Sequence, residues 1–460
     1  MVSCDLLFVK KAHFCLPYPS ASLCPIPNVN MENLTFSIIL ITHNRSYSLR
    51  RALDALQSQT YPMDLIEVRV VVDSCIDDTL AMLQDYKAPF KMHTIEANCR
   101  SVGMSRNIGA AEANGQILLF LDDDIEAMPC LVENHWRVQR EHPGCAAIGP
   151  YPPKLQSRAK FFEVEVRTWW EEKFYQMRKP AHRYSYQDLL CGNLSIDTKL
   201  FASTGGFDPA FGPGTAYEDY EFALRLLKAN VPFAVAPDAV GYHYEHETNN
   251  IERSFGRSRA EGRSDVLIGE RHPEIKPILH LKDYDTPDSV VDKILVAIVF
   301  LWPAALDLLV VGLRTSLDWL EYLGMRGSWR WLRTKLLAYS YLRGVMDQLK
   351  TRSALSSFMQ EGTGGADWGG HEINIDLQQG WEAAERLLDA ERPAGVYLYY
   401  GEQTVGHILP QAGTERLRGA HLRSILARQF AEPLARAIGI NGMPKNIATT
   451  AEVPLIFVKN

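Results

Sequence analysis

The chain has 460 residues, of which 46% are hydrophobic and 22% charged, which is enough for the cores of two or three domains. Its net charge of −7 argues against a general nucleic-acid-binding protein. The eight cysteines form no Cys-x-x-Cys pair, which excludes a zinc module and a disulfide framework and suits a reducing cytoplasm.

Residues 1–34 show neither helix nor strand periodicity and contain several prolines. Lys10 and Lys11 interrupt the only apolar stretch, so this segment does not resemble a signal peptide. We expect a disordered N-terminal extension.

Three apolar runs, at residues 36–42, 68–72 and 117–121, predict strands of a parallel sheet covered on both faces, because their apolar residues hardly alternate with polar ones. Helices are predicted over residues 48–59 and after Thr79. This order of strands and helices indicates an α/β sheet, in which ligands gather at the carboxyl ends of the strands.

Polar residues follow each of these strands: residues 42–45 after the first, Asp73 after the second, and Asp122, Asp123 and Asp124 after the third. Three consecutive carboxylates repel one another, and a divalent cation that links them to a phosphorylated substrate explains the arrangement. A solvated acidic loop is the alternative interpretation of the last group.

Six motifs in this order resemble the family 2 glycosyltransferases of the GT-A fold. They are Thr42-His43-Asn44-Arg45, Val71-Val72-Asp73, Ser105-Arg106-Asn107-Ile108-Gly109, Asp122-Asp123-Asp124, Gly205-Gly206-Phe207-Asp208, and Glu218-Asp219 with Arg225. The resemblance covers residues 36–246, about half of the chain. The loop after Asp73 departs from the family pattern, being one residue shorter and carrying Ser74 where a second Asp is common.

On the donor side, the resemblance implies a nucleotide-diphosphate sugar, with UDP favoured by its frequency in the family. It implies Mn²⁺ or Mg²⁺ held by Asp122 and Asp124, with His243 as a further ligand. The implied donor-binding residues are Thr42, Asn44, Arg45, Asp73, Arg106, Asp122 and Asp123. An Asx-turn that caps the next helix is an equal alternative for Asp73.

On the acceptor side, the resemblance implies that Asp219 is the catalytic base and that transfer inverts the anomeric carbon. Gly192, Asn193, Gly206 and Glu218 occupy acceptor-side positions. Simple capping of a helix N-terminus is the alternative for Glu218 and Asp219. Aromatic residues at 169, 170, 174 and 175 stack on an acceptor sugar in one interpretation and belong to the core in the other.

Residues 253–271 carry five arginines and resemble a mobile basic lid, with a solvated helix face as the alternative. Residues 286–350 form a hydrophobic helical segment whose most apolar part, 294–313, contains Pro303 and Asp307. Because both flanks are basic, we expect a helix pair on the inner leaflet of the cytoplasmic membrane rather than a single span. A buried helical hairpin on the catalytic domain is the alternative.

We expect a GT-A domain over residues 35–285, a linker over 351–370, and a small α+β domain over 371–460. The last of these has predicted strands at 373–377, 396–400, 404–408 and 455–458, and helices at 381–388 and 416–438.

The sequence thus predicts a metal-dependent inverting glycosyltransferase that acts on a glycan or lipid-linked acceptor in polysaccharide or glycolipid synthesis. Two other functions remain open. A sugar-nucleotide nucleotidyltransferase would need a Gly-rich basic loop after the first strand, where residues 42–45 are found instead. A non-catalytic, membrane-attached scaffold that binds glycans or nucleotides would keep the acidic residues without turnover.

Overall fold

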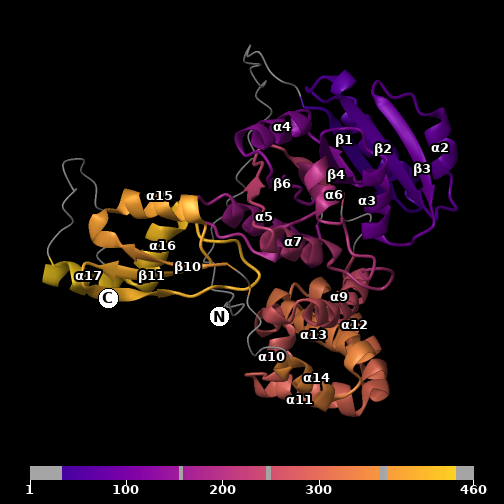
Figure 1. Cartoon of the computed structure of the whole chain (residues 1–460). Helices are drawn as coiled ribbons and strands as arrows, with labels where there is room; N and C mark the ends of the chain where they lie inside the picture. Colours follow the sequence, from indigo (N-terminus) through magenta and orange to yellow (C-terminus); the bar gives the residue numbers. More distant parts are fainter. Residues whose placement is uncertain (1–33, 155–158, 245–249, 362–367, 369, 442–460) are drawn as a thin grey trace. The chain divides into compact units, whose positions relative to one another are not determined.

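The computed structural model describes residues 34–154, 159–244, 250–361, 368 and 370–441 (Figure 1). The predicted N-terminal extension and the predicted strand at 455–458 lie outside these residues, apart from Leu34.

A seven-stranded mixed sheet forms the N-terminal part, with the strand order β3-β2-β1-β4-β7-β6-β8. Strands β1, β2, β3 and β4 are mutually parallel, and β7 pairs antiparallel with both β4 and β6. The bounds are β1 Phe36–Thr42, β2 Ile66–Asp73, β3 Lys91–Ala97, β4 Ile117–Asp122, β6 Ala146–Ile148, β7 Asn193–Asp197 and β8 Phe233–Val235. The three predicted strands are confirmed, and side chains from both faces of β1 and β2 are buried, as continuous apolar runs require.

Seven helices accompany this sheet among the described residues: α1 Ser46–Leu56, α2 Thr79–Asp85, α3 Val102–Ala111, α4 Leu131–Glu141, α5 Phe161–Met177, α6 Thr198–Ser203 and α7 Glu218–Lys228. Helix α3 lies close to the sheet at Gly109, where a Cβ atom would stand 2.6 Å from Ile39 Cγ2 and 3.1 Å from Val71 Cγ2. Short 3₁₀ helices occur at Met63–Leu65, Tyr186–Asp188, Pro273–Ile278 and Leu377–Gln379.

The register of the sheet aligns the strand ends that carry the predicted site. Ile41 pairs with Asp122 across β1 and β4, and Thr42 pairs with Val72 across β1 and β2. A separate two-stranded sheet, β5 Ile125–Ala127 with β9 Gly241–His243, sets Ile125 opposite His243. The chain beyond β4 and the chain around His243 are therefore neighbours.

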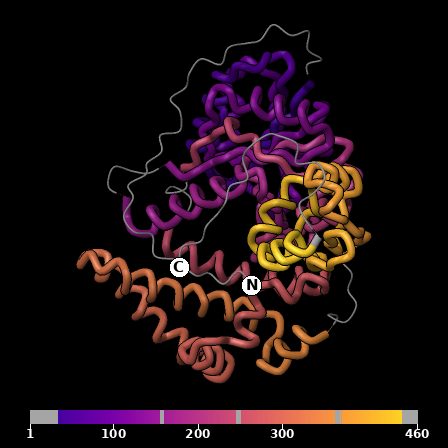
Figure 2. The backbone as a smooth tube through the Cα atoms, turned by 90° about the vertical axis from the view of Figure 1, so that its left-hand side faces the viewer, coloured from indigo at the N-terminus to yellow at the C-terminus, as the bar shows by residue number. Residues whose placement is uncertain are grey.

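Among the described residues, six helices lie between β9 and β10: α9 Ile251–Arg271, α10 Leu281–Asp285, α11 Val290–Leu301, α12 Pro303–Tyr322, α13 Arg326–Leu349 and α14 Arg352–Gln360. Helices α9 and α13 pack along each other (Figure 2). Glycines make this close contact possible, because a Cβ atom at Gly262 would collide with Tyr341 O and one at Gly344 with Arg259 O.

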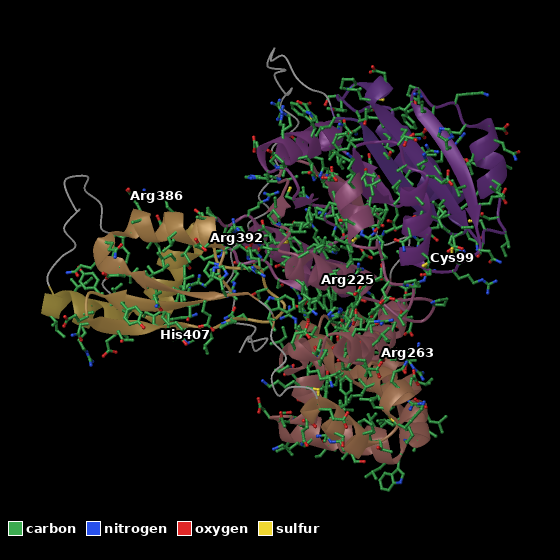
Figure 3. The ribbon with its side chains drawn as sticks, in the orientation of Figure 1. Cys99, Arg225, Arg263, Arg386, Arg392 and His407 are labelled. Carbon is green, nitrogen blue, oxygen red and sulfur yellow. The ribbon has the colours of Figure 1, made fainter. Side chains whose placement is uncertain are left out.

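Residues 253–271, the predicted basic lid, lie within the single helix α9, which is packed on one side and exposed at Arg253, Gly256 and Arg257. Their role as a lid stays a prediction. Arg259 and Arg263 both bond to Asp347 of α13, and Arg271 pairs with Asp208. Arg263 is labelled in Figure 3. These pairs bind the arginines to carboxylates of the protein itself.

Residues 294–313 form no single helix, because the chain breaks between α11 and α12 at Trp302 and Pro303 begins α12. Among the described helices, none has both the length and the apolarity to cross a bilayer.

The predicted linker at 351–370 is wrong in its first part. Residues 352–360 form α14, whose Leu355 and Phe358 are buried and whose N-terminus is capped by Thr351.

The C-terminal module has a three-stranded sheet in the order β10-β11-β12, with β10 Glu372–Asp376, β11 Gly395–Tyr400 and β12 Gln403–Ile408. The predicted hairpin is confirmed as the antiparallel pair β11–β12. Helix α15 Trp381–Glu391 is confirmed, but the single predicted helix over 416–438 is wrong. It is divided at Phe430 into α16 Gly419–Gln429 and α17 Ala431–Asn441, because Pro433 fits only the first turn of a new helix.

Candidate active site

A single buried arginine connects the two acidic parts of the predicted site. Arg106 of α3 donates from Nη2 to Asp122 Oδ1 at 3.0 Å and from Nη1 to Glu218 Oε1 at 3.1 Å. Burial alone would lower the pKa of this guanidinium, but the charges of Asp122 and Glu218 raise it instead. The contact requires a close approach of α3 to α7, which Gly103 permits because its Cβ would stand 3.0 Å from Phe207 Cβ and 3.4 Å from Glu218 Cβ.

Asp219 lies next to this clamp in the first turn of α7. Burial and the charge of Glu218 raise its pKa to about 7, against the opposing charges of Arg106 and Arg257. A carboxylate with this pKa changes protonation near neutral pH, as a general base requires.

Asp219 and Asp122 are both near enough to the buried Tyr151 for their charges to act on it. Burial and the charges of both aspartates raise the pKa of this phenol. The same charged groups act on the buried thiol of Cys191. Burial and the charges of Asp219, Glu218 and Asp122 raise the pKa of this thiol, and the charge of Arg106 opposes the increase. The acidic end of β4 and the start of α7 therefore form one site.

The three consecutive carboxylates point to different partners. Asp122 bonds to Arg106, Asp123 accepts from Arg45 at 2.9 Å, and Asp124 Oδ1 lies 3.0 Å from His243 Nε2. Burial and the neighbouring Asp124 raise the pKa of Asp123 to about 6, although Arg45 opposes this shift. The predicted residues Arg45, His243 and the acidic run are thus brought together.

The described residues contain no group of three His, Cys, Asp or Glu side chains arranged to hold a metal ion. They do present a carboxylate and an imidazole, Asp124 and His243, at 3.0 Å. Mg²⁺ is commonly held by only one or two protein ligands together with substrate phosphates, so this pair fits an ion that arrives with a diphosphate. Asp122 faces Arg106, and its predicted role as a ligand stays a prediction.

Gly192 forms the wall behind Asp122. A Cβ atom at this position would stand 2.7 Å from Asp122 Oδ2 and 2.8 Å from the Tyr151 ring. Its carbonyl oxygen accepts a hydrogen bond from the Asp122 backbone N–H at 3.2 Å. Only glycine leaves room for the aspartate here.

Two predicted acceptor-side residues have structural roles. Asn193 is completely buried, where it bonds to His135 Nε2 at 2.8 Å and donates to Ala239 O at 2.7 Å. Gly206 has a φ of 65° and lies so close to Asn107 Oδ1 that a Cβ would stand 2.5 Å from it. The polar atoms of Asn193 bond to side chains and backbone of the core, and its acceptor-side role stays a prediction.

Asp73 is fully engaged within the chain. Its carboxylate accepts from the backbone N–H groups of Cys99, Arg100 and Ser101 and from the hydroxyls of Ser74 and Ser105, at 2.9–3.2 Å. Burial would raise the pKa of Asp73, but these hydrogen bonds lower it. The carboxylate thus organises the loop before α3 rather than capping α2, and its predicted contact with the donor stays a prediction.

The remaining predicted donor residues are Thr42 and Asn44, and Asn44 joins the loop after β1 to the loop after β2. Asn44, at a φ of 53°, accepts at Oδ1 from Ile76 N at 2.7 Å, and its own N–H donates to Cys75 Sγ at 3.1 Å. Thr42 ends β1 and is buried. These contacts form the rim beside Arg45 and Asp123.

Sequence reasoning missed Tyr151 and Cys191, whose only signal is their position next to a strand end and next to Gly192. Tyr151 packs on Trp170 at 4.5 Å between ring centroids, and Phe174 is buried beside it. The core interpretation is therefore confirmed for Trp170 and Phe174, whereas Trp169 and Tyr175 are exposed.

Part of the chain is similar to known glycosyltransferases. Residues 37–204 match the model of glycosyl transferase family 2. A validoxylamine A glucosyltransferase of Streptomyces hygroscopicus is 28% identical over 255 residues, which cover 50% of this chain and 55% of that protein. An uncharacterized glycosyltransferase of Haemophilus influenzae is 30% identical over 201 residues, covering 42% of this chain and 62% of that protein.

A solved mannosyltransferase from Pyrobaculum calidifontis, in complex with GDP-Man and Mn²⁺, aligns with a TM-score of 0.46 and 18% identity. The alignment covers 69% of this chain and 88% of that one. The chain spans between about half and two thirds of the length of the curated relatives described above.

Residues 37–204 are thus similar to family 2 glycosyltransferases, and they lie in the part of the chain that forms the mixed sheet flanked by helices.

Proposed function

We propose that this enzyme transfers a sugar from a nucleotide-diphosphate sugar to a hydroxyl group of a glycan or lipid-linked acceptor, with inversion at the anomeric carbon. The observation that carries the proposal is the clamp formed by Arg106, which holds Asp122 at 3.0 Å and Glu218 at 3.1 Å and so joins the strand-end carboxylates to the carboxylates of α7. A transfer reaction needs both groups of carboxylates at the same sugar, one for the donor and the other for the acceptor.

Asp219 supplies the base in this proposal. An alcohol attacks well only when its proton has an acceptor, and a carboxylate with a pKa of about 7 can take that proton at neutral pH. Glu218 is held by Arg106 and is not available for this role. A single displacement by the deprotonated hydroxyl inverts the anomeric carbon.

The donor side is built from Arg45, Asp123, Asp124 and His243. Mn²⁺ or Mg²⁺ held by Asp124 and His243 would neutralise the charge that grows on the departing diphosphate. Arg45, paired with Asp123 and 40% exposed at its side chain, can turn one face toward the same phosphates. Arg106 keeps Asp122 oriented at the edge of this site.

A carbohydrate acceptor is supported by the aromatic residues of α5. Trp169 is half-exposed, and its ring contacts Trp170 at 5.0 Å, which in turn packs on Tyr151 beside Asp122. An exposed indole offers an apolar face to a sugar ring. This placement supports a role in polysaccharide or glycolipid synthesis.

Two measurements on the purified chain test the proposal. A thermal-shift screen of nucleotides and nucleotide sugars, with and without Mn²⁺, identifies the donor, because a ligand of the folded state raises Tm. Release of the nucleoside diphosphate from that donor is then followed with candidate glycan acceptors, and product NMR gives the anomeric configuration.

We expect turnover that stops on chelation and returns with Mn²⁺ or Mg²⁺, and an inverted product. Release of pyrophosphate from a nucleoside triphosphate and a sugar phosphate would instead indicate a nucleotidyltransferase. Donor binding without any turnover across the acceptors would indicate a scaffold.

A further inference from the structure

Helix α12 exposes an apolar face. Leu308, Val311, Trp319 and Tyr322 are all exposed and are separated by three or eleven residues, spacings that return to the same side of an α-helix. Leu308 is 79% exposed and Trp319 67%. Among the exposed residues of α12 only Thr315 and Asp318 are polar, and the Thr315 hydroxyl donates to Gly312 O within the helix.

Three of the four charged residues of α12 bond to the rest of the protein, and the fourth, Asp318, is exposed. Asp307, Arg314 and Glu321 follow one another at intervals of seven residues. Asp307 accepts from Arg343 of α13 at 3.1 Å and from Tyr339, and Arg314 donates to Glu252 of α9 at 3.3 Å. Glu321 accepts from the backbone N–H of Phe161 in α5 at 2.5 Å.

Helix α12 is apolar on two sides: Val310 and Leu317 are buried against the protein, as is usual for a surface helix, and the exposed side is apolar as well. Asp307, Arg314 and Glu321 bond to α13, α9 and α5, so a rotation of α12 that buried the exposed apolar side would break those bonds. A contiguous exposed apolar face is typical of an interaction site.

The apolar surface extends beyond α12 and has aromatic residues at both ends. Leu301 and Trp302 continue it on one side, and Leu323, Met325 and Trp331 on the other; all five are exposed. Tryptophan and tyrosine are enriched where one part of a ring meets lipid and the other meets headgroups and water. A helix of this length covers about 30 Å of surface.

The charge of this region differs in sign from that of the rest of the chain. Residues 290–350 contain eight basic and five acidic residues, a balance of +3, whereas the whole chain has −7 and the remainder therefore −10. Arg326 and Arg330 lie beside the aromatic end, with side chains 47% and 39% exposed even though both pair with Glu165. Such a region is attracted to an anionic surface that repels the rest of the protein.

We propose that the exposed face of α12, with its extensions at Trp302 and Trp331, docks on the surface of an anionic lipid bilayer. Leu308, Leu309, Val311 and Trp319 enter the boundary between headgroups and acyl chains, and the arginines at the start of α13 face the headgroup phosphates. The proposal is independent of the transfer reaction, because it rests on a surface distinct from Asp219 and Arg106.

The test is co-sedimentation of the full chain with vesicles of phosphatidylcholine and phosphatidylglycerol. The test variant is Leu308→Gln combined with Trp319→Gln. The matched control is Leu409→Gln, which removes a leucine that is 63% exposed between β12 and α16. All these side chains are exposed, so each variant should keep the wild-type Tm, and this is measured first.

We expect the wild-type chain and Leu409→Gln to sediment with the vesicles, and the double variant to partition at least about tenfold less well, since each buried leucine contributes about this factor or more. Equal sedimentation of the double variant, or no sedimentation of the wild type, would overturn the proposal. So would a wild-type dimer in analytical ultracentrifugation that the double variant converts to a monomer, because the face would then bind a second copy of the chain.

Discussion

Replacing Asp219 by asparagine is the most informative perturbation of this enzyme. The substitution keeps the size of the side chain and removes the carboxylate that accepts the proton in the proposed mechanism. General-base catalysis contributes about 10²- to 10⁴-fold, so kcat should fall by that factor while donor binding persists. Glu218 cannot compensate, because Arg106 holds it at 3.1 Å.

The pH dependence of the wild-type enzyme provides a second measure of the same residue. With a pKa of about 7, Asp219 loses its ionised form as the pH falls, so kcat/KM should fall about tenfold per pH unit below 7 and level off above it. A carboxylate whose pKa rises on folding makes the folded state less stable as the pH rises toward 7. Asp219→Asn should therefore not lower Tm at pH 8.

The assay is diphosphate release under saturating donor, with thermal shift to report donor binding. Asp238→Asn is the matched control, because Asp238 is an exposed aspartate outside the site. Activity of Asp219→Asn within a few-fold of wild type, or a wild-type profile that is flat between pH 5 and 8, would refute the assignment of the base.

Three further predictions follow from the packing of the site and of the helices. Arg106→Met should lower the free energy of unfolding by about 3–5 kcal/mol and abolish transfer, since it leaves Asp122 and Glu218 without their shared cation; urea denaturation measures the first and diphosphate release the second. Gly192→Ala should weaken donor binding in the thermal-shift assay and cost about 1–3 kcal/mol, because its Cβ would stand 2.7 Å from Asp122 Oδ2, whereas Gly439→Ala, with nothing within 4 Å, should do neither. Gly344→Ala should lower Tm by forcing α13 away from Arg259 O, yet leave kcat per folded molecule unchanged; an unchanged Tm would contradict the packing of α9 on α13.

Much of the fold could be predicted from the sequence where a local pattern determines it. The strand predicted at residues 36–42 has the same bounds as β1, because a short, continuous apolar run between polar residues is typical of a buried strand. The predicted helix at 416–438 failed at Phe430, because periodicity continues through a break that depends on Pro433 and on packing. The predicted linker failed at α14 because Ser and Ala also suit a short helix once Leu355 and Phe358 find a core.

The site itself was predicted as a set of residues but not as a set of contacts. The motifs located Arg106, the acidic run, Glu218, Asp219 and His243, and the structure brings these together. The same reasoning assigned Asn193 to the acceptor side, although its amide group forms hydrogen bonds inside the core. Residue type and order cannot distinguish a polar group that faces a substrate from one that satisfies a buried neighbour.

The sequence by itself determined that a parallel sheet ends in carboxylates and that a second carboxylate pair opens a later helix, because strand, helix and turn signals are local. Only the tertiary structure decided that Arg106 reaches both Asp122 and Glu218, that Asp73 is saturated by the loop before α3, and that α12 turns its apolar side outward. Each of these depends on which elements become neighbours. That choice is made by the packing of the whole chain, in which Asp122 and Glu218, far apart in the sequence, bond to the same guanidinium.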